Sequence, residues 1–485
     1  MSTQDENAHV KFSDLFKEGR ALLTLTLILS VGSHATNLFV TRTVLPTIVA
    51  DIGGKELMYW ALALFQIAAI VGGMGSAQIK DKLGGRHTIY LAAALLVVGS
   101  CFAGFAQHFG YLVLGRGIQG FAEGLLISLS YIILSESYPN NLMARMIGML
   151  AVVWAAASAI GPLAAGLLES SFGWRSAFLV NLVIAILLVV QSRYAVKQQP
   201  SQKDGQRIPI ARLALFVSAI TGICLTGQFT NPVLILAILA FSFTLLAFAI
   251  KRDKRAKNRM LPNQIFTTKG TIGLGIWTNI SISIAVGGHG VYGVALLQSM
   301  WQLSPIYAGF LASIVAAAWS VASWGLSGVA KLKNQLLLIR TGITMITFSF
   351  PITALAWSLT NLTIATLGFA ILGLGLGTST IFLEKKIMHA ATHKEKDRTS
   401  SILPPIDSAA GAIGAAFASI LALSLGLFGG TPTFGILDAQ VASVVATQMY
   451  LTFFALSVPA MVMSFLLPLD DSQSERSNNT QPIAE

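Results

Sequence analysis

The chain consists mainly of long apolar runs, each close in length to the thickness of a membrane. The hydrocarbon core of a bilayer is roughly 30 Å thick and takes about 20 apolar helical residues to cross, so such runs predict spanning helices. We expect fourteen of these helices, at residues 21–50, 58–79, 88–106, 110–137, 146–169, 175–195, 211–229, 231–250, 270–298, 304–329, 336–357, 361–383, 400–428 and 443–468. An even number of crossings places both chain ends on one side of the membrane.

The composition excludes a water-soluble fold. Of the 485 residues, 54% are hydrophobic and 11% are charged, whereas soluble domains contain about 25% charged residues. The predicted fold class is therefore an all-α integral membrane protein. Both cysteines, Cys101 and Cys224, lie within apolar runs, so neither a disulfide framework nor a zinc cluster is expected. We expect no metal and no cofactor.

Lysine and arginine are divided unevenly between the two sides of the predicted membrane. Of 32 such residues, 28 fall in segments on the side of the chain ends. Lys55 and Arg175 lie on the opposite side, and Arg42 and Arg116 lie within spans. Because positively charged loops stay in the cytoplasm, this asymmetry predicts cytoplasmic termini. It also accounts for the formal net charge of +11, and its dispersal over short loops argues against a nucleic-acid partner.

Two longer polar stretches divide the predicted helices into groups of six, two and six. The densest basic run, Lys251 to Arg259, is typical either of contact with anionic membrane lipid or of an ordinary cytoplasmic loop. The predicted segments are a cytoplasmic N-terminal segment (1–20), an N-terminal six-helix bundle (21–195), a cytoplasmic linker (196–210), two inserted helices (211–250), a basic cytoplasmic loop (251–269), a C-terminal six-helix bundle (270–468) and a cytoplasmic tail (469–485).

A charged segment with two glycines, "DKLGGRH" (Asp81 to His87), interrupts the apolar sequence between the second and third predicted helices. We expect a sharp, flexible loop there. The segment resembles the cytoplasmic loop signature of the major facilitator superfamily, in which an Asp is followed three residues later by Gly and then by basic residues. The resemblance implies that Asp81, Gly84 and Arg86 form a latch for one conformation, with the carboxylate near a helix N-terminus.

Further motifs follow in the order found in that family. "LGRGIQG" (Leu114 to Gly120) resembles its Arg-x-x-Gln-Gly motif, and "AIGPLAAG" (Ala159 to Gly166) resembles the Gly-Pro signature of proton-coupled antiporters, here carried by Gly161, Pro162 and Gly166. "GWRSAFLVN" (Gly173 to Asn181) and "LLQSMWQLSPIYAG" (Leu296 to Gly309) are similar to segments of the fourteen-span drug:proton antiporter branch. The resemblance implies two six-helix bundles, a central two-helix insertion and a bacterial plasma-membrane transporter, an inner-membrane protein that functions as a monomer.

The chain departs from this branch at three places. The helix-one positions that usually hold Asp and Asn hold Asn37 and Arg42. The second-half counterpart of the loop signature has no Asp. Asp407 stands where helix thirteen often has Arg. Recognition of cationic drugs through helix one, and a proton pathway through its Asp, are therefore not expected in their usual form.

Charged residues inside predicted spans are functional candidates, because a charge near mid-bilayer requires a partner or an aqueous cavity. Arg116 and Glu123 are seven residues apart on one helix, so they lie on nearly the same face about 10 Å apart. One hypothesis is that Glu123 carries the coupling proton and is approached by Arg42 or Arg116. The alternative is a static ion pair that braces the N-terminal bundle.

Other polar residues are candidates for the substrate cavity. His34 and Asn37 fall near the middle of the first span, and Gln119 belongs to the fourth-helix motif. The segment around His289 and Tyr292 contains four glycines, which favours an unwound helix beside a cavity. His289 is predicted either to contact cargo or to pack as a neutral side chain. Asp407 is predicted to take part in proton coupling or gating, or else to face cytoplasmic water.

Together these features favour a secondary active transporter that works by alternating access and exports a small organic molecule in exchange for protons. The first alternative is uptake of a vitamin-like or organic-anion nutrient, for example a flavin such as riboflavin, since Arg42 favours a cargo that is not a cation. A remote alternative is a membrane sensor or enzyme on the same scaffold. No nucleophile motif or large soluble domain supports that alternative, so we do not expect an enzyme.

Overall fold

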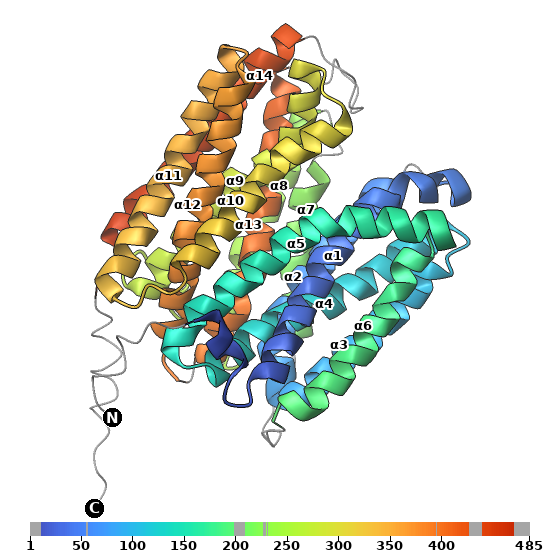
Figure 1. The fold of residues 1–485 in the computed structure, drawn as a ribbon, viewed down its shortest axis with the longest axis vertical. Helices are drawn as coiled ribbons and strands as arrows, with labels where there is room; N and C mark the ends of the chain where they lie inside the picture. The colour runs from blue at the N-terminus through green and yellow to red at the C-terminus, as the bar shows by residue number, and fades with distance from the viewer. Residues whose placement is uncertain are drawn as a thin grey trace, which may run out of the picture.

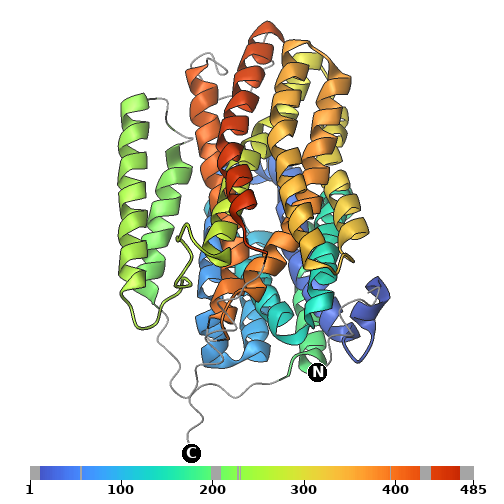
Figure 2. The same cartoon turned by 90° about the vertical axis from the view of Figure 1, so that its left-hand side faces the viewer.

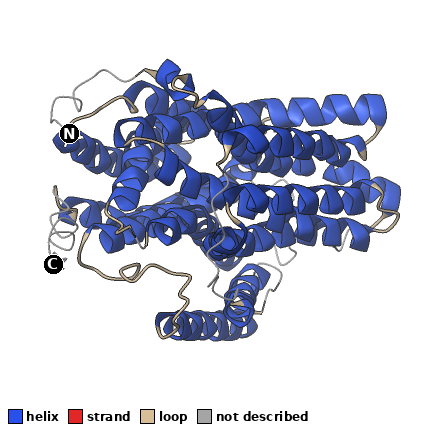
Figure 3. Ribbon diagram, turned by 90° about the horizontal axis from the view of Figure 1, so that it is seen from below, coloured by secondary structure: helices blue, strands red, loops and turns tan. Residues whose placement is uncertain are grey.

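The computed structural model describes residues 11–54, 57–197, 209–226, 229, 231–393, 395–425 and 439–469. Within these ranges the chain is helical, and Figure 3 shows helices and loops without a strand. Each of the fourteen predicted spans corresponds to one α-helix. The helices are α1 (Ala21–Ile52), α2 (Met58–Leu83), α3 (Gly85–Gly104), α4 (Phe109–Ser137), α5 (Asn140–Phe172), α6 (Ser176–Ala195), α7 (Ile210–Leu225), α8 (Pro232–Lys254), α9 (Thr271–Trp301), α10 (Pro305–Leu326), α11 (Leu332–Ser358), α12 (Leu362–His389), α13 (Lys396–Ser424) and α14 (Ala439–Leu466).

Thirteen of the described helices are long and apolar enough to cross a membrane. The exception is α7, which has 16 residues. At 1.5 Å of rise per residue it is about 24 Å long, shorter than the hydrocarbon core of roughly 30 Å. The span predicted at 211–229 therefore ends sooner than expected.

The segment between α2 and α3 is not the flexible loop expected at residues 81–87. Helix α2 continues through Leu83 and α3 begins at Gly85, so Gly84 alone separates them. Gly84 has φ 80° and ψ 157°, a conformation that side chains with a Cβ rarely adopt. A single glycine thus reverses the chain direction, and the charged residues around it lie on helix ends.

Helices α1–α6 pack against one another, as do α9–α14, and we call these two groups the first half and the second half. Figure 1 shows the first half in blue to green and the second half in yellow to red. The α2–α3 junction, residues 255–270, residues 390–393 and Glu395 lie at the same end of the helices, which we call the basic side. Contacts between the halves join α2 and α4 to α13, and α5 to α10 and α12.

Close approach of α2 and α4 depends on glycine. A Cβ atom at Gly124 would overlap the backbone carbonyl of Ala69, and one at Gly120 would overlap that of Phe65. Small residues at such positions let helix backbones approach closely in a membrane, where van der Waals packing provides much of the attraction between helices. The carboxylate of Glu123, between these two glycines, is consequently held deep within the first half.

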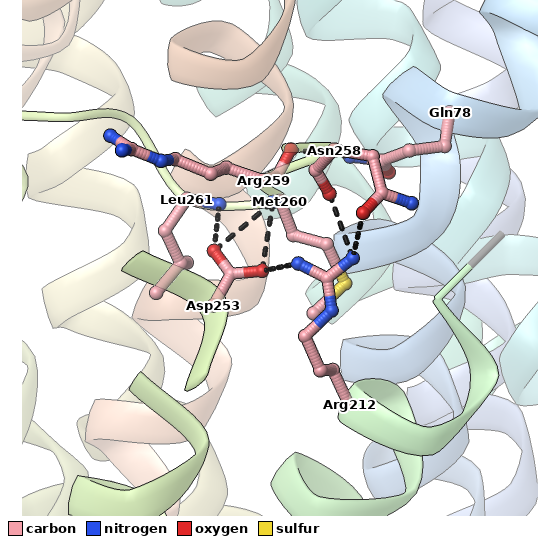
Figure 4. A network of polar contacts seen from close by, with 7 residues as sticks. All are labelled: Gln78, Arg212, Asp253, Asn258, Arg259, Met260 and Leu261. Carbon is pink, nitrogen blue, oxygen red and sulfur yellow. Dashed lines mark hydrogen bonds and ion pairs between the residues drawn. The ribbon is translucent and has the colours of Figure 1, made fainter. Parts of the chain in front are cut away.

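Helices α7 and α8 form a hairpin along one side of the molecule (Figure 2). Its ends are joined by a polar network at the basic side (Figure 4). Arg212 donates hydrogen bonds to Asp253 (2.5 Å) and to the backbone carbonyl of Asn258 (2.8 Å). Asp253 also accepts from the backbone N–H groups of Met260 and Leu261, at 3.1 and 3.0 Å. The basic run that begins at Lys251 is therefore partly helical and partly an ordered turn.

The hairpin also contacts both halves. Helix α7 packs against α2 and α13. Gln78 of α2 donates to the backbone carbonyl of Arg259 at 3.3 Å, and an added Cβ at Gly75 would lie 3.8 Å from a methyl group of Leu213. Helix α7 therefore lies along the line where α2 and α13 meet.

Candidate functional site

A cavity of about 360 Å³ lies between the two halves. Its walls come from α1, α2, α4 and α5 of the first half and from α9, α10, α12 and α13 of the second half. The titratable and aromatic side chains in its described lining are His34, Tyr131, Trp154, Trp319, Glu384 and Asp407. Its volume falls in the range of small-molecule sites, roughly 300–1,000 Å³. Both halves contribute to it, so a ligand bound there would contact both.

A cluster of ion pairs joins the two halves at the basic side. The ammonium group of Lys80 on α2 lies 2.5 Å from Glu136 of α4 and 2.6 Å from Asp397 of α13. The Lys80 side chain is 5% exposed, whereas the carboxylates are 26% and 27% exposed. Because the lysine is shielded from water, salt screens these pairs less than surface pairs. The cluster therefore holds α2 and α13 together.

A 3-10 helix that precedes α1, Phe12–Phe16, makes a second connection between the halves. The ring of Phe12 stacks on Trp324 of α10 with 6.0 Å between ring centroids. The guanidinium of Arg145 on α5 lies 4.7 Å from the centre of the Phe12 ring, and it donates to Ser327 at 3.1 Å. In Figure 1 the ends of α5 and α11 remote from the basic side point away from each other. The halves are therefore joined at the basic side and diverge at the opposite side.

The first half contains a buried polar cluster around Glu123. Its Oε1 accepts hydrogen bonds from Asn37 Nδ2 (2.9 Å) and Ser33 Oγ (3.2 Å) of α1. Arg116 is fully buried, and its Nη1 donates to Asn37 Oδ1 at 2.8 Å. Asn37 therefore bridges Arg116 and Glu123, which their spacing on α4 predicted to lie on nearly the same helix face. The two opposite charges compensate each other within the first half.

The same network includes Gln119 but keeps it away from the cavity. Gln119 accepts from Arg116 at 2.9 Å and donates to Ser100 of α3 at 2.8 Å. The guanidinium of Arg116 also lies 3.9 Å from the ring centre of Phe65. Gln119 is fully buried and is absent from the described cavity lining. Its contacts thus fix the orientation of Arg116.

His34 and Arg42 have different environments. His34 lines the cavity, and its Nδ1 lies 3.5 Å from Glu123 Oε2, beyond normal hydrogen-bond length. The ring is packed 5.4 Å from Phe65 and 5.7 Å from Trp154. His34 therefore separates Glu123 from the cavity. Arg42 is exposed, does not reach the Glu123 cluster, and has no hydrogen bond or ion pair within the described part of the chain.

The second half contributes two carboxylates to the cavity. Asp407 accepts hydrogen bonds from Asn279 Nδ2 (2.6 Å) and Ser283 Oγ (3.3 Å) of α9. Glu384 of α12 is 8% exposed and interacts with Asp407 and with the hydroxyl of Tyr131. Its Oε2 has no hydrogen-bond partner among the described residues. These acidic groups have neutral neighbours, whereas Glu123 has Arg116 nearby.

His289 and Tyr292 lie inside the second half, away from the cavity. Helix α9 is continuous from Thr271 to Trp301, so the expected unwinding at the glycines is not observed. The glycines instead allow close packing: a Cβ at Gly287 would overlap the backbone carbonyl of the facing helix α13. His289 hydrogen-bonds to Tyr450 (2.7 Å), and both His289 and Tyr292 are buried.

Asp81, Gly84 and Arg86 are grouped at the basic side. Arg86 donates to the backbone carbonyl of Val196 at 2.9 Å, a contact within the first half. Asp81 is half-buried and lies in the electrostatic field of Asp397, in the first turn of α13. In this conformation the bond to α13 is made by the neighbouring Lys80, which lies on α2 beyond the predicted span 58–79.

The Gly161, Pro162 and Gly166 motif lies within α5, which is continuous through it. A Cβ at Gly161 would lie 3.0 Å from Phe39 of α1, whereas one at Gly166 would meet no atom within 4 Å. Proline within a helix removes one backbone hydrogen bond and favours bending. The motif therefore shapes the contact between α5 and α1 without lining the cavity.

Two polar groups of the structure, Glu384 and the Lys80 cluster, were not among the predicted site residues. Glu384 was excluded because hydropathy placed the end of its helix at residue 383, whereas α12 continues to His389. The Lys80 cluster was missed because its members come from three separate helix ends. Opposite charges at those ends, in "KDK", "SES" and "KDR", were the available signal.

A multi-pass helical chain that surrounds a cavity between two groups of helices has the architecture of a membrane transporter. The chain belongs to the Major Facilitator Superfamily, whose family model matches residues 27–415. The predicted membership in this family is therefore confirmed.

Several bacterial relatives are similar to this chain. The "Probable multidrug-efflux transporter Rv1634" of Mycobacterium tuberculosis (strain ATCC 25618 / H37Rv) is 27% identical over 305 residues, 61% of this chain and 64% of the relative. The "Multidrug efflux pump SdrM" of Staphylococcus aureus (strain N315) is 26% identical over 66% of this chain and 71% of the relative. The "Multidrug transporter protein MdtP" of Bacillus subtilis (strain 168) is 24% identical over 74% and 68%, respectively. The match thus spans less than two thirds of the length of the mycobacterial relative.

Solved structures support the fold. The human organic anion transporter MFSD10 (TETRAN) has a TM-score of 0.66 with 12% identity, covering 91% of this chain and all of that chain. The proton:xylose symporter XylE has a TM-score of 0.62 with 14% identity, covering 92% of this chain and 96% of that one. At this level of identity the likeness concerns the fold alone.

Proposed function

We propose that this chain is a secondary active transporter that exports small organic molecules from a bacterial cell in exchange for protons. Two six-helix bundles, α1–α6 and α9–α14, rock about the central cavity, and α7–α8 are inserted between them. The protein acts as a monomer in the plasma membrane (the inner membrane where there are two), with both termini and the basic side facing the cytoplasm and its basic residues contacting lipid headgroups.

The observation that carries this proposal is a cavity that both halves line and that ion pairs close off at one side. The bonds from Lys80 to Glu136 and Asp397 join the halves at the basic side, while the opposite helix ends diverge. Alternating access requires such a state and its opposite, in which these pairs separate. The names of the bacterial relatives support the export direction.

Uptake of a vitamin-like or anionic nutrient is the less favoured function. The argument for it was Arg42, which lies outside the cavity lining. The charged side chains that do line the cavity are the carboxylates of Glu384 and Asp407, which would repel an anion. A sensor or enzyme on this scaffold is disfavoured because the family consists of transporters.

The proposal can be tested in proteoliposomes of known orientation that contain a pH-sensitive dye. Amphipathic drugs, organic acids and flavins are added outside, and an uncoupler control measures passive proton flow. Export by exchange predicts that a transported compound drives protons out of the lumen as it enters. Acidification of the lumen when the compound is added would instead establish symport. A flux of the compound that does not depend on the proton gradient would refute coupling.

A further inference from the structure

We propose that Glu384 and Asp407 together bind the positively charged group of an organic cation, and that a proton takes the place of this cation when it leaves. The proposal rests on the proposed function, because it names the cargo class and the exchange site of the same transporter. It assigns selectivity to the second half and adds Glu384 to Asp407, which the sequence already offered, beside Glu123, as a candidate for proton coupling.

The first observation concerns Glu384. Its side chain is 8% exposed and lines the cavity, yet its Oε2 has no hydrogen-bond partner within the described residues. A buried carboxylate oxygen without a donor is costly, because it has lost water and gained nothing in return. A proton on the carboxyl group, or a cationic ligand in the cavity, removes that cost.

The second observation is that Asp407 adds another negative group beside Glu384. Asp407 accepts hydrogen bonds from Asn279 and Ser283, which are both neutral. The two carboxyl groups interact electrostatically, and neither is ion-paired to a Lys, Arg or His of the described chain. Two neighbouring carboxylates without a cation do not both remain ionised. The pair therefore requires at least one proton or one cation.

The other charged and titratable groups around this pair do not supply that charge. From α4 the Tyr131 hydroxyl faces Glu384, and from α1 His34 lines the cavity. Lys385 follows Glu384 on α12, but its ammonium donates to Gln335 of α11 at 3.3 Å. The described cavity lining from α2, α5, α9 and α10 contains no titratable side chain. The positive charge must therefore come from a proton or from a cationic ligand that enters the cavity.

The aromatic lining favours an organic cation over a simple metal ion. Trp154 of α5 and Trp319 of α10 line the same cavity as Tyr131. Indole and phenol rings attract ammonium-type cations through their π faces and stack on flat apolar bodies. The indole N–H of Trp319 also has no partner among the described residues. An aromatic cation would place its charge at the carboxylates and its body against these rings.

The cluster in the first half also has a buried carboxylate oxygen, Glu123 Oε2, without a hydrogen-bond partner among the described residues, but this cluster contains its own cation, Arg116. Glu123 accepts hydrogen bonds from Ser33 and Asn37, and Asn37 links it to Arg116. Its negative charge is therefore already compensated inside the first half, and His34 lies between it and the cavity. This arrangement corresponds to a brace that holds α1 and α4 together.

The test measures binding of ethidium, an aromatic cation, and 1-pyrenesulfonate, an aromatic anion, to the purified full-length protein by equilibrium dialysis. Wild-type protein should bind ethidium about tenfold more weakly at pH 6 than at pH 8.5, because protons occupy the carboxylates at the lower pH. The affinity for 1-pyrenesulfonate should not fall between pH 8.5 and pH 6. Glu384→Gln and Asp407→Asn should each weaken ethidium binding about tenfold or more and abolish its pH dependence. Wild-type affinity and pH dependence in both variants would overturn the proposal.

Controls separate this inference from a folding defect and from the proposed function. Glu169→Gln makes the same chemical change on α5, outside the cavity lining, and should bind ethidium like wild type. If Glu384→Gln does not fold, Glu384→Asp should fold and retain pH-dependent binding. If the proteoliposome assay finds proton exchange with neutral or anionic compounds and never with cations, export stands and this inference is wrong. If no compound exchanges with protons, the proposed function itself fails.

Discussion

The ammonium group of Lys80 lies 2.6 Å from a carboxylate oxygen of Asp397, although the two residues are 317 positions apart in the chain. The bond connects α2 of the first half with α13 of the second half. Glu136 lies 2.5 Å from the same ammonium group and strengthens the cluster. Because α2 and α13 belong to different halves, this ion pair should exist only while the basic side is closed.

Replacement of Lys80 should open the basic side. Lys80→Met leaves the carboxylates of Glu136 and Asp397, which both contact Lys80, without a shared cation, so the two negative charges repel each other. We expect spin labels across the α2–α13 contact to show a larger distance, and proton-driven export to fall about tenfold. The charge swap Lys80→Asp with Asp397→Lys should restore part of the closure. If the basic side of the double variant is no more closed than that of either single variant, the pair does not set the equilibrium between the closed and open basic side.

Phe12→Ala should weaken closure at the opposite edge of the basic side. The change removes the stack on Trp324 and the cation–π contact with Arg145. Each such contact contributes about 0.5–1.5 kcal/mol. We expect faster labelling of a cysteine placed at Ser327, measured with a membrane-impermeant maleimide. Phe16→Ala is the matched control, because Phe16 is exposed; equal labelling in the two variants would contradict the prediction.

Removal of Arg116 should destabilise the first half. Arg116→Met leaves the buried Glu123 without its compensating charge, which we expect to lower the free energy of unfolding by about 3 kcal/mol. The double variant Arg116→Met, Glu123→Gln should recover much of this loss, because no uncompensated charge remains. Thermal unfolding in detergent measures both. A double variant that is less stable than the single variant would show that the pair contributes more than mutual neutralisation.

Gly124→Ala should destabilise the contact between α2 and α4. The added methyl group would overlap the Ala69 backbone, and overpacking of this kind costs about 1–3 kcal/mol. Gly309→Ala on α10 is the control, since a Cβ there meets no atom within 4 Å and alanine favours the helix. Thermal unfolding in detergent should separate the two variants, with Gly309→Ala equal to or above wild type. Equal loss in both would contradict close packing as the cause.

Hydropathy and charge predicted the helices well because both reflect the membrane itself. The bilayer requires long apolar helices and retains basic loops on one side, and all fourteen predicted spans have a helical counterpart. Boundaries were less accurate: α12 extends past the apolar run, so Glu384 was assigned to a loop. A buried carboxylate near a helix end looks the same in sequence as an exposed one.

Contacts within one helix could be predicted, whereas contacts between distant segments could not. The spacing of Arg116 and Glu123 predicted a shared helix face, because helical periodicity alone determines which side of a helix a residue occupies. The bridging role of Asn37, and the packing of His289 against Tyr450, depend on how separate helices face each other. The glycines around His289 illustrate the ambiguity, since the same residues permit either unwinding or close packing, and the structure has close packing.

Helix α7 lies along the seam between α2 and α13, so compounds dissolved in the lipid do not have equal access to the two seams between the halves. A hydrophobic cargo that diffuses within the bilayer could reach the central cavity only through one of the two seams between the halves. The hairpin lies against the α2–α13 seam (Figure 2), while at the α5–α10 seam the five-residue 3-10 helix Phe12–Phe16 covers the basic end. Lateral entry, if cargo uses it, is therefore directed to the face formed by α5 and α10.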